Sequence, residues 1–135
     1  MTQATRFLTR EEILAQKSLP RETVHVPEWG GDVIIKGMTG AERDAFESSV
    51  IDKKGSRHPQ VNTRNLRAKL VSRCAIYEDG SLLFPEEKDV EALGALSASA
   101  LSRLYDVASR LAGISEEDIE DLAKNSGSDL SGVSS

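Results

Sequence analysis

Few residues of this 135-residue chain could take part in chemistry, and their spacing does not bring them together. His25 stands in a run of alternating polar and apolar residues, and His58 stands directly before Pro59. Neither histidine has a serine, cysteine or carboxylate at a spacing typical of a nucleophile–base pair. Cys74 lies on the apolar stripe of a predicted helix, where a buried thiol is expected rather than a reactive one. We therefore expect no catalytic residues and no enzymatic role.

The sequence also predicts no cofactor and no metal. The single cysteine excludes an internal disulfide and leaves no thiol pair for a metal ion. The glycine-bearing stretches WGGD and GMTG lack the spacing and the lysine of a phosphate-binding loop. No apolar run approaches the ~20 residues that span a bilayer, and MTQATRFLTREEILAQK lacks the apolar centre of a secretory signal. We expect a soluble protein of a reducing cytosol with no membrane partner.

Charge is distributed unevenly around a net charge of -5. Lys53 to Arg73 contains seven basic residues and no acidic one, whereas Glu78 to Asp129 contains thirteen acidic residues and four basic ones. The basic segment has no interleaved aromatic residues to stack on bases, so nucleic-acid binding is not expected. Two roles remain for the basic segment: it forms a solvated helix face, or it forms a surface that attracts the acidic end of another copy. The second predicts rings or filaments held by charge, with these residues as candidates: Arg64, Arg67, Arg73, Glu116, Glu117 and Asp121.

The elements that would carry these residues are clearest between Val24 and Val50. Val24 and Val26 alternate with polar residues, a turn that tolerates positive φ follows at 29–31, and residues 33–35 return as a β-branched run. This pattern predicts a hairpin. Thr39 and Glu42 then form a capping box at the start of a helix that carries Ala45, Phe46 and Val50.

The rest of the chain predicts further helices and one more turn. A capping box at Thr9 and Glu12 begins a short helix to about Lys17, which is too short to be stable unless it docks on the domain or on a partner. An exposed loop is expected at 52–62, followed by a helix over 63–76 with Leu66, Leu70, Val71 and Cys74 on one face. A hairpin turn at Asp79-Gly80 and a short helix from Pro85 to Leu93 come next. The last two elements are a core helix capped by Ser97 or Ser99 and closed by Gly113, and an acidic helix from Ser115 with Ile119 and Leu122.

These elements predict one domain of the α+β class, mainly helical, with short antiparallel β-hairpins packed on a small helical bundle. Aromatic residues make up only 4% of the chain, which favours helix packing on aliphatic side chains. We divide the chain into an N-terminal arm with a short helix (1–20), a single domain (21–125) that includes the exposed loop 52–62, and a disordered tail or linker (126–135).

The order of three stretches resembles a known family. VPEWGGDVIIKGMTGAERDAF, then NLRAKLVSRCAIYEDGSLLF, then LSRLYDVASRLAGISEEDIEDLAKN is similar to the tail assembly chaperones of long-tailed, siphovirus-type bacteriophages, over about Thr9 to Asn125. The resemblance implies a protein that binds the long helical tape measure protein and keeps it soluble until tail tube subunits displace it. It also implies a place in the bacterial host cytoplasm and absence from the mature virion.

The family often makes a longer form by a minus-one ribosomal frameshift, and the added domain recruits tail tube subunits. Ala123-Lys124-Asn125 can be encoded by GCA AAA AAC, which contains the slippery run A AAA AAC. The codons of the gene would decide whether this slip site exists.

The apolar residues around the hairpin and the helix after it are the candidates for contact with the tape measure protein: Trp29, Met38, Phe46 and Val50. They exceed what a two-stranded hairpin needs for itself. Trp29 could equally fold back onto the sheet. The alternative function is a structural tail-completion protein or a nucleic-acid-binding phage regulator that uses the segment from Arg57 to Arg73.

Overall fold

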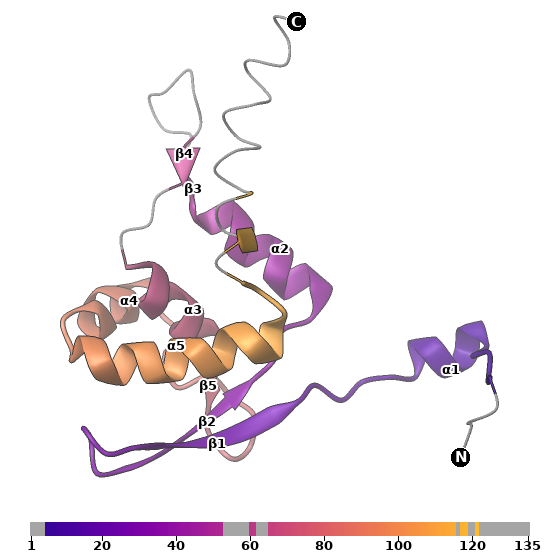
Figure 1. Ribbon diagram of the computed structural model, residues 1–135, viewed down its shortest axis with the longest axis horizontal. Coiled ribbons are helices and arrows are strands. Elements are labelled where there is room, and N and C mark those ends of the chain that lie inside the picture. The colour runs from indigo at the N-terminus through magenta and orange to yellow at the C-terminus, as the bar shows by residue number, and fades with distance from the viewer. Residues whose placement is uncertain (1–4, 53–59, 62–64, 116, 119–120, 122–135) are drawn as a thin grey trace, which may run out of the picture.

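The computed structural model of the protein describes residues 5–52, 60–61, 65–115, 117–118 and 121. Its elements are, in chain order, α1 (Arg10–Leu14), β1 (Arg21–Val26), β2 (Gly31–Lys36), α2 (Gly40–Ser49), β3 (Ile51–Asp52), β4 (Gln60–Val61), α3 (Leu66–Cys74), β5 (Ala75–Ile76), α4 (Glu87–Gly94) and α5 (Ala98–Ala112). One antiparallel sheet has the order β1-β2-β5, and β3 pairs with β4. Helix α5 lies along the sheet and packs on α3, which in turn contacts α4 (Figure 1). The predicted mainly helical α+β class is confirmed.

The first hairpin joins β1 to β2 as the sequence predicts. Val26 and Ile35 are fully buried and Val24 nearly so, whereas His25 between the two valines is exposed. The chain reverses through a tight turn in which the Trp29 N–H donates to the Val26 carbonyl at 3.0 Å. Gly30 adopts a φ of 68°, a left-handed conformation that favours glycine. The turn therefore forms where the glycine signal placed it.

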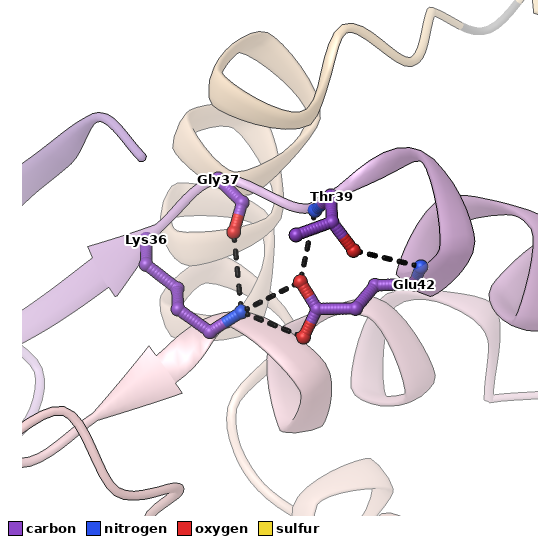
Figure 2. Close-up of polar contacts among 4 residues, drawn as sticks. All are labelled: Lys36, Gly37, Thr39 and Glu42. Atoms are coloured by element: carbon purple, nitrogen blue, oxygen red, sulfur yellow. Dashed lines mark hydrogen bonds and ion pairs between the residues drawn. The ribbon is translucent and has the colours of Figure 1, made fainter. Parts of the chain in front are cut away.

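The start of α2 is fixed to the end of β2 by a polar cluster (Figure 2). The Thr39 hydroxyl accepts from the Glu42 N–H at 3.1 Å, and the Glu42 carboxylate accepts from the Thr39 N–H at 2.8 Å. This is the predicted capping box. The Lys36 ammonium, whose side chain is only 13% exposed, donates to the same carboxylate at 3.1 Å and to the Gly37 carbonyl at 3.2 Å. Partial burial acts to raise the pKa of Glu42, but the hydrogen bonds from Thr39 and Lys36 outweigh it and hold this pKa below its usual range.

Helix α3 supplies one side of the core. Leu70, Val71 and Cys74 of the predicted apolar stripe are fully buried, and Leu66 is partly buried. The helix begins at Leu66, later than the predicted start at residue 63, and residues 62–64 lie outside the described chain. The cap residue Asn65 has a φ of 56° and makes no side-chain capping bond, so this helix start lacks the hydrogen bond that an N-cap side chain usually accepts.

The predicted turn at Asp79-Gly80 is present and closes a small hairpin. The Gly80 N–H donates to the Tyr77 carbonyl at 3.0 Å, and Gly80 has a φ of 94°. Ile76 forms a bridge with Leu82 across this turn. The preceding residues, Ala75 and Ile76, also pair with β2 as a third strand, which the sequence did not reveal because β5 is two residues long.

Helix α5 is the core helix that the sequence predicts. The Ser97 hydroxyl accepts from the Ala100 N–H at 3.4 Å, and Gly113 closes the helix with a φ of 72°. Its buried face consists of Ala100, Leu101, Leu104, Tyr105 and Ala108. Burial of each leucine contributes about 1.5–3 kcal/mol, so this face is a major source of stability.

Boundaries differ from the predictions elsewhere too, and α3 ends at Cys74 rather than at residue 76. Helix α1 ends at Leu14, earlier than Lys17. Helix α4 begins at Glu87 rather than Pro85, because the Glu86 N–H is capped by the Asp89 carboxylate at 3.0 Å. The expected loop 52–62 is closed at its ends by the β3–β4 pair.

Other predictions fall outside the described chain. Ile119 and Leu122 of the acidic helix and the tail 126–135 are among them. Among the described residues, no helix has the length and apolar character needed to cross a membrane.

Candidate functional site

The groups that could do chemistry are placed apart. The His25 Nδ1 lies 2.8 Å from the Asp32 Oδ1, and both side chains are exposed on the β1–β2 hairpin. Cys74 is fully buried, and desolvation raises the pKa of its thiol to about 11, so it stays protonated at neutral pH. Within the described residues no three metal-ligating side chains come together. His58 lies outside them.

The tip of the β1–β2 hairpin is held by helix α5. Arg103 donates through Nε and Nη2 to the two carboxylate oxygens of Glu28, at 3.3 and 3.2 Å. The Ser99 hydroxyl donates to the same carboxylate at 2.8 Å. The Arg103 hydrogen bonds are the main cause that lowers the pKa of Glu28 to about 2, so this carboxylate is ionised at neutral pH. These charge-assisted hydrogen bonds join the turn to helix α5.

Two exposed apolar residues are close in sequence to the residues of this contact. Trp29 follows Glu28 and is 39% exposed, and Leu96 lies three residues before Ser99 and is 47% exposed. We call Trp29 and Leu96 the tip surface. Trp29 is thus neither fully packed on the sheet nor fully free, and a partly exposed tryptophan on a rigid turn is typical of an interface anchor. The sequence singled out Trp29 and missed Leu96, which stands between two helices and has no periodic neighbours.

The other three candidate contact residues belong to the interior. Phe46 and Val50 are fully buried, and Met38 is partly buried against the core. Their side chains therefore hold α2 on the domain, and the described conformation does not present Phe46 or Val50 to a partner. The sequence pattern could not separate these roles, because the apolar stripe of a helix has the same period whether it faces a core or a partner.

The predicted basic surface is carried by α3. Arg67 is exposed, and its guanidinium lies 5.5 Å from the centre of the Tyr105 ring, which fixes it against α5. Lys69 and Arg73 are partly buried on the same helix, which has no acidic residue. The remaining basic candidate, Arg64, lies outside the described residues.

The acidic candidates lie after α5. Glu117 and Asp121 are exposed, and Glu116 is outside the described residues. The Ser115 backbone N–H donates to the Asp118 carboxylate at 2.8 Å, and this hydrogen bond is the main cause that lowers the pKa of Asp118. Asp118 also lies 3.7 Å from Arg43 of α2. The acidic segment is therefore tied to its own domain at one point while Glu117 and Asp121 stay accessible.

Helix α1 of the N-terminal arm lies apart from the domain (Figure 1). The described residues of the arm, 5–20, are all exposed except Leu19 and Glu12, which is partly buried within the capping box of α1. The exposed large apolar side chains of the arm are Phe7 (87% exposed), Leu8 (51%), Ile13 (53%) and Leu14 (55%). The sequence predicted a short helix that needs a docking site, and within the described chain this helix has none.

Two comparisons with known proteins found a match. The family model described as phage tail assembly chaperone matches residues 9–125. The solved structure of the bacteriophage HK97 tail assembly chaperone is similar, with a TM-score of 0.53 and 19% identity over 78% of this chain and 95% of that chain. At that identity the similarity shows a shared fold. No curated protein matches the sequence.

Proposed function

Because this chain belongs to the phage tail assembly chaperone family, we propose that it binds the tape measure protein and keeps it soluble while the tail is assembled. The observation that carries the proposal is the apolar surface exposed by a small, otherwise well-packed domain. Trp29 and Leu96 at the tip and four large apolar residues on the arm are exposed. Exposed aromatic and aliphatic side chains of this kind anchor many protein interfaces.

The tip surface is the best candidate for the contact. A long amphipathic helix presents an apolar stripe, which an aromatic side chain on a rigid support can cover at low entropic cost. The Arg103–Glu28 contact provides that support by fixing the turn that carries Trp29. Met38 remains a secondary candidate because it is only partly buried. Phe46 and Val50 would contact a partner only if α2 moved from the domain, since both are fully buried.

Self-association is part of the proposal. The exposed Arg67 and Glu117 lie on separate elements, and each could meet its opposite on another copy, together with Arg64, Arg73, Glu116 and Asp121. Such contacts join a copy head to tail and build rings or filaments. Assemblies held by exposed charges should weaken as salt rises. Sedimentation that does not change between low and high ionic strength would exclude charge as the cause.

The tail tube protein is the proposed second partner. It would be recruited by a longer form of the chain made by a frameshift at Ala123-Lys124-Asn125. The short and the longer form of this chain would act in the host cytoplasm and be left out of the mature virion. Mass spectrometry of infected cells tests for the longer form, since a peptide that crosses Asn125 into the second frame identifies it. Mass spectrometry of purified virions tests whether the chain is left out of the virion.

Co-expression with the tape measure protein tests the main proposal. The wild-type chain should raise the soluble fraction of the tape measure protein, and Trp29→Ser together with Leu96→Ser should lower that gain by about tenfold, as expected for loss of an interface anchor. Tyr77→Ser is the matched control, because Tyr77 is 55% exposed but lies outside the tip surface and the arm. A double variant that solubilises as well as the control would remove the tip surface from the proposal.

A further inference from the structure

The chain turns sharply after α5 and is held against the core. Gly113 closes the helix with a φ of 72°, and the Ile114 N–H donates back to the Ser109 carbonyl at 2.9 Å. This pattern pairs backbone groups that the end of a helix would otherwise leave unpaired. The Ile114 side chain is only 4% exposed and belongs to the hydrophobic core cluster. The course of the chain after α5 is therefore specified both by backbone hydrogen bonds and by a buried side chain.

A second local structure follows this turn directly. The Ser115 hydroxyl accepts from the Asp118 N–H at 3.1 Å, and the Asp118 carboxylate accepts from the Ser115 N–H at 2.8 Å. These two hydrogen bonds hold the carboxylate in place and lower the pKa of Asp118, so it is ionised at neutral pH. We call Gly113, Ile114, Ser115 and Asp118 the C-terminal connector. Figure 1 shows the chain after α5 turning toward α2.

One guanidinium joins the C-terminal connector to α2. The Arg43 Nη1 donates to the Gly113 carbonyl at 3.0 Å, and its Nη2 lies 3.7 Å from the Asp118 carboxylate. The Arg43 Nε donates to Glu47 of its own helix at 2.7 Å, which holds the planar group in position. The Gly113 carbonyl lies at the end of α5, where the helix dipole favours a positive charge. A guanidinium presents donors in several fixed directions, so Arg43 can bind three partners at once.

Helix α2 is held on the domain by few buried side chains. The structure describes all ten of its residues, and Phe46 is the only one of them that is buried; Val50, directly after the helix, is buried too. By contrast, α5 buries five residues. The start of α2 is held by the Lys36–Glu42 ion pair (Figure 2). Because an element that buries few side chains opens at a lower free energy than the whole domain, α2 should open before α5 does.

We propose that α2 and the C-terminal connector open together as one unit, coupled by Arg43, while α3, α5 and the β1-β2-β5 sheet stay folded. Phe46 of α2 and Ile114 of the connector both belong to the core cluster. When α2 leaves the domain, the Gly113 carbonyl and the Asp118 carboxylate lose Arg43. When the connector leaves, α2 keeps only its buried side chains and the contact at its start. Each element therefore stabilises the other, although Arg43 and Gly113 are 70 positions apart.

The opening unit gives α2 a second state with a different surface. Phe46 and Val50 are buried in the described state and would face solvent in the open one. The open state is thus the one in which these two candidate residues could meet the tape measure protein, a consequence that rests on the proposed function. The opening itself does not rest on it, because it depends only on contacts within the chain. A partner that binds one state of α2 better would also set the order of the connector.

Native-state hydrogen exchange of the full chain, followed for each amide by NMR in increasing urea, tests for the unit. The amides of α2 and of Ile114 should exchange at one common free energy of opening. Their exchange should be at least about tenfold faster than that of the slowest α5 amides and should depend less on urea. If the α2 amides have the same free energy of opening and urea dependence as those of α5, α2 opens only when the domain unfolds, and the inference is overturned. If Ile114 exchanges at a different free energy from α2, the coupling is overturned.

Two arginine variants separate opening of the unit from global unfolding. Arg43→Gln should speed the exchange of α2 and Ile114 by about tenfold, as expected for loss of charge-assisted hydrogen bonds. Arg103→Gln is the matched control, because Arg103 also binds a carboxylate on another element but lies in the part that stays folded. It should speed the slowest α5 amides and leave α2 and Ile114 within about twofold of wild type, since the closed and open states lose this contact equally. If Arg103→Gln speeds α2 as much as α5, or Arg43→Gln leaves α2 unchanged, the inference is wrong. Exchange is measured on the chain alone, so failure of this inference leaves the proposed function open to its own test.

Discussion

Phe46 distinguishes a core role from a binding role, and its replacement gives the sharpest stability prediction. The ring is fully buried in the cluster that joins α2 to α3 and the sheet. Phe46→Ala removes most of the side chain and leaves a cavity, which costs about 3–5 kcal/mol. Single domains are stable by about 5–15 kcal/mol, so the variant should lose a large share of its free energy of unfolding.

Thermal unfolding followed by circular dichroism measures this loss. For a chain of 135 residues, 3–5 kcal/mol corresponds to a fall in Tm of about 10–20 °C. Phe46→Leu keeps most of the volume and should cost less than about 1.5 kcal/mol. Trp29→Ala is the matched surface change and should cost about 1 kcal/mol or less, since Trp29 is 39% exposed.

The comparison of the two alanine variants shows whether Phe46 supports the core and whether Trp29 belongs to the surface. If Phe46→Ala unfolds within 1 kcal/mol of wild type, the ring does not support the core, and our placement of α2 is wrong. If Trp29→Ala loses as much stability as Phe46→Ala, the tip is part of the core and cannot be a surface for a partner.

Three further predictions concern groups fixed by the fold. The pKa of Glu28 is lowered from 4.5 to about 2, so the ionised carboxylate stabilises the fold above pH 4.5, and this stabilisation is lost as the pH falls toward 2. The Tm difference between wild type and Glu28→Gln should therefore shrink between pH 4.5 and pH 2. A Tm difference that stays constant over this range would contradict the Arg103 contact. Gly37→Ala should destabilise the protein by about 1–3 kcal/mol in urea unfolding, because an added Cβ would lie 2.9 Å from the Leu111 carbonyl; a variant as stable as wild type would show that this contact relaxes freely. Cys74 should react with a thiol reagent at least tenfold more slowly in the native protein than in the unfolded protein, because it is fully buried; equal rates would show an open core.

The sequence was sufficient wherever one local rule decides the structure. Both capping boxes, at Thr9 and Thr39, form as their spacing predicts. The turn glycines Gly30 and Gly80 have positive φ, and Gly113 closes α5. In each case the residue type satisfies a backbone requirement of its immediate neighbours, so no knowledge of the rest of the fold is needed.

The sequence was insufficient where distant elements decide the outcome. The β5 strand exists because Ala75 and Ile76 meet β2, and two residues carry no pattern that predicts this. The Arg103–Glu28 ion pair joins residues 75 positions apart. The burial of Phe46 depends likewise on which elements cover α2.

The candidate site was therefore predicted only in part. Trp29 is partly exposed and remains a candidate, while Leu96 was missed. The arm was recognised as needing a partner, but the exposure of its four apolar residues appears only when the elements are placed in space.

We propose that this protein holds the tape measure protein in solution. The most direct measurement is the amount of tape measure protein that stays soluble and co-purifies with the tagged wild-type chain when both are expressed together, with the Trp29→Ser/Leu96→Ser and Tyr77→Ser variants in parallel. We predict co-purification with the wild type and with Tyr77→Ser and a loss of about tenfold with the tip variant. A tape measure protein that is equally soluble with and without the wild-type chain, and is not retained by it, would contradict the claim.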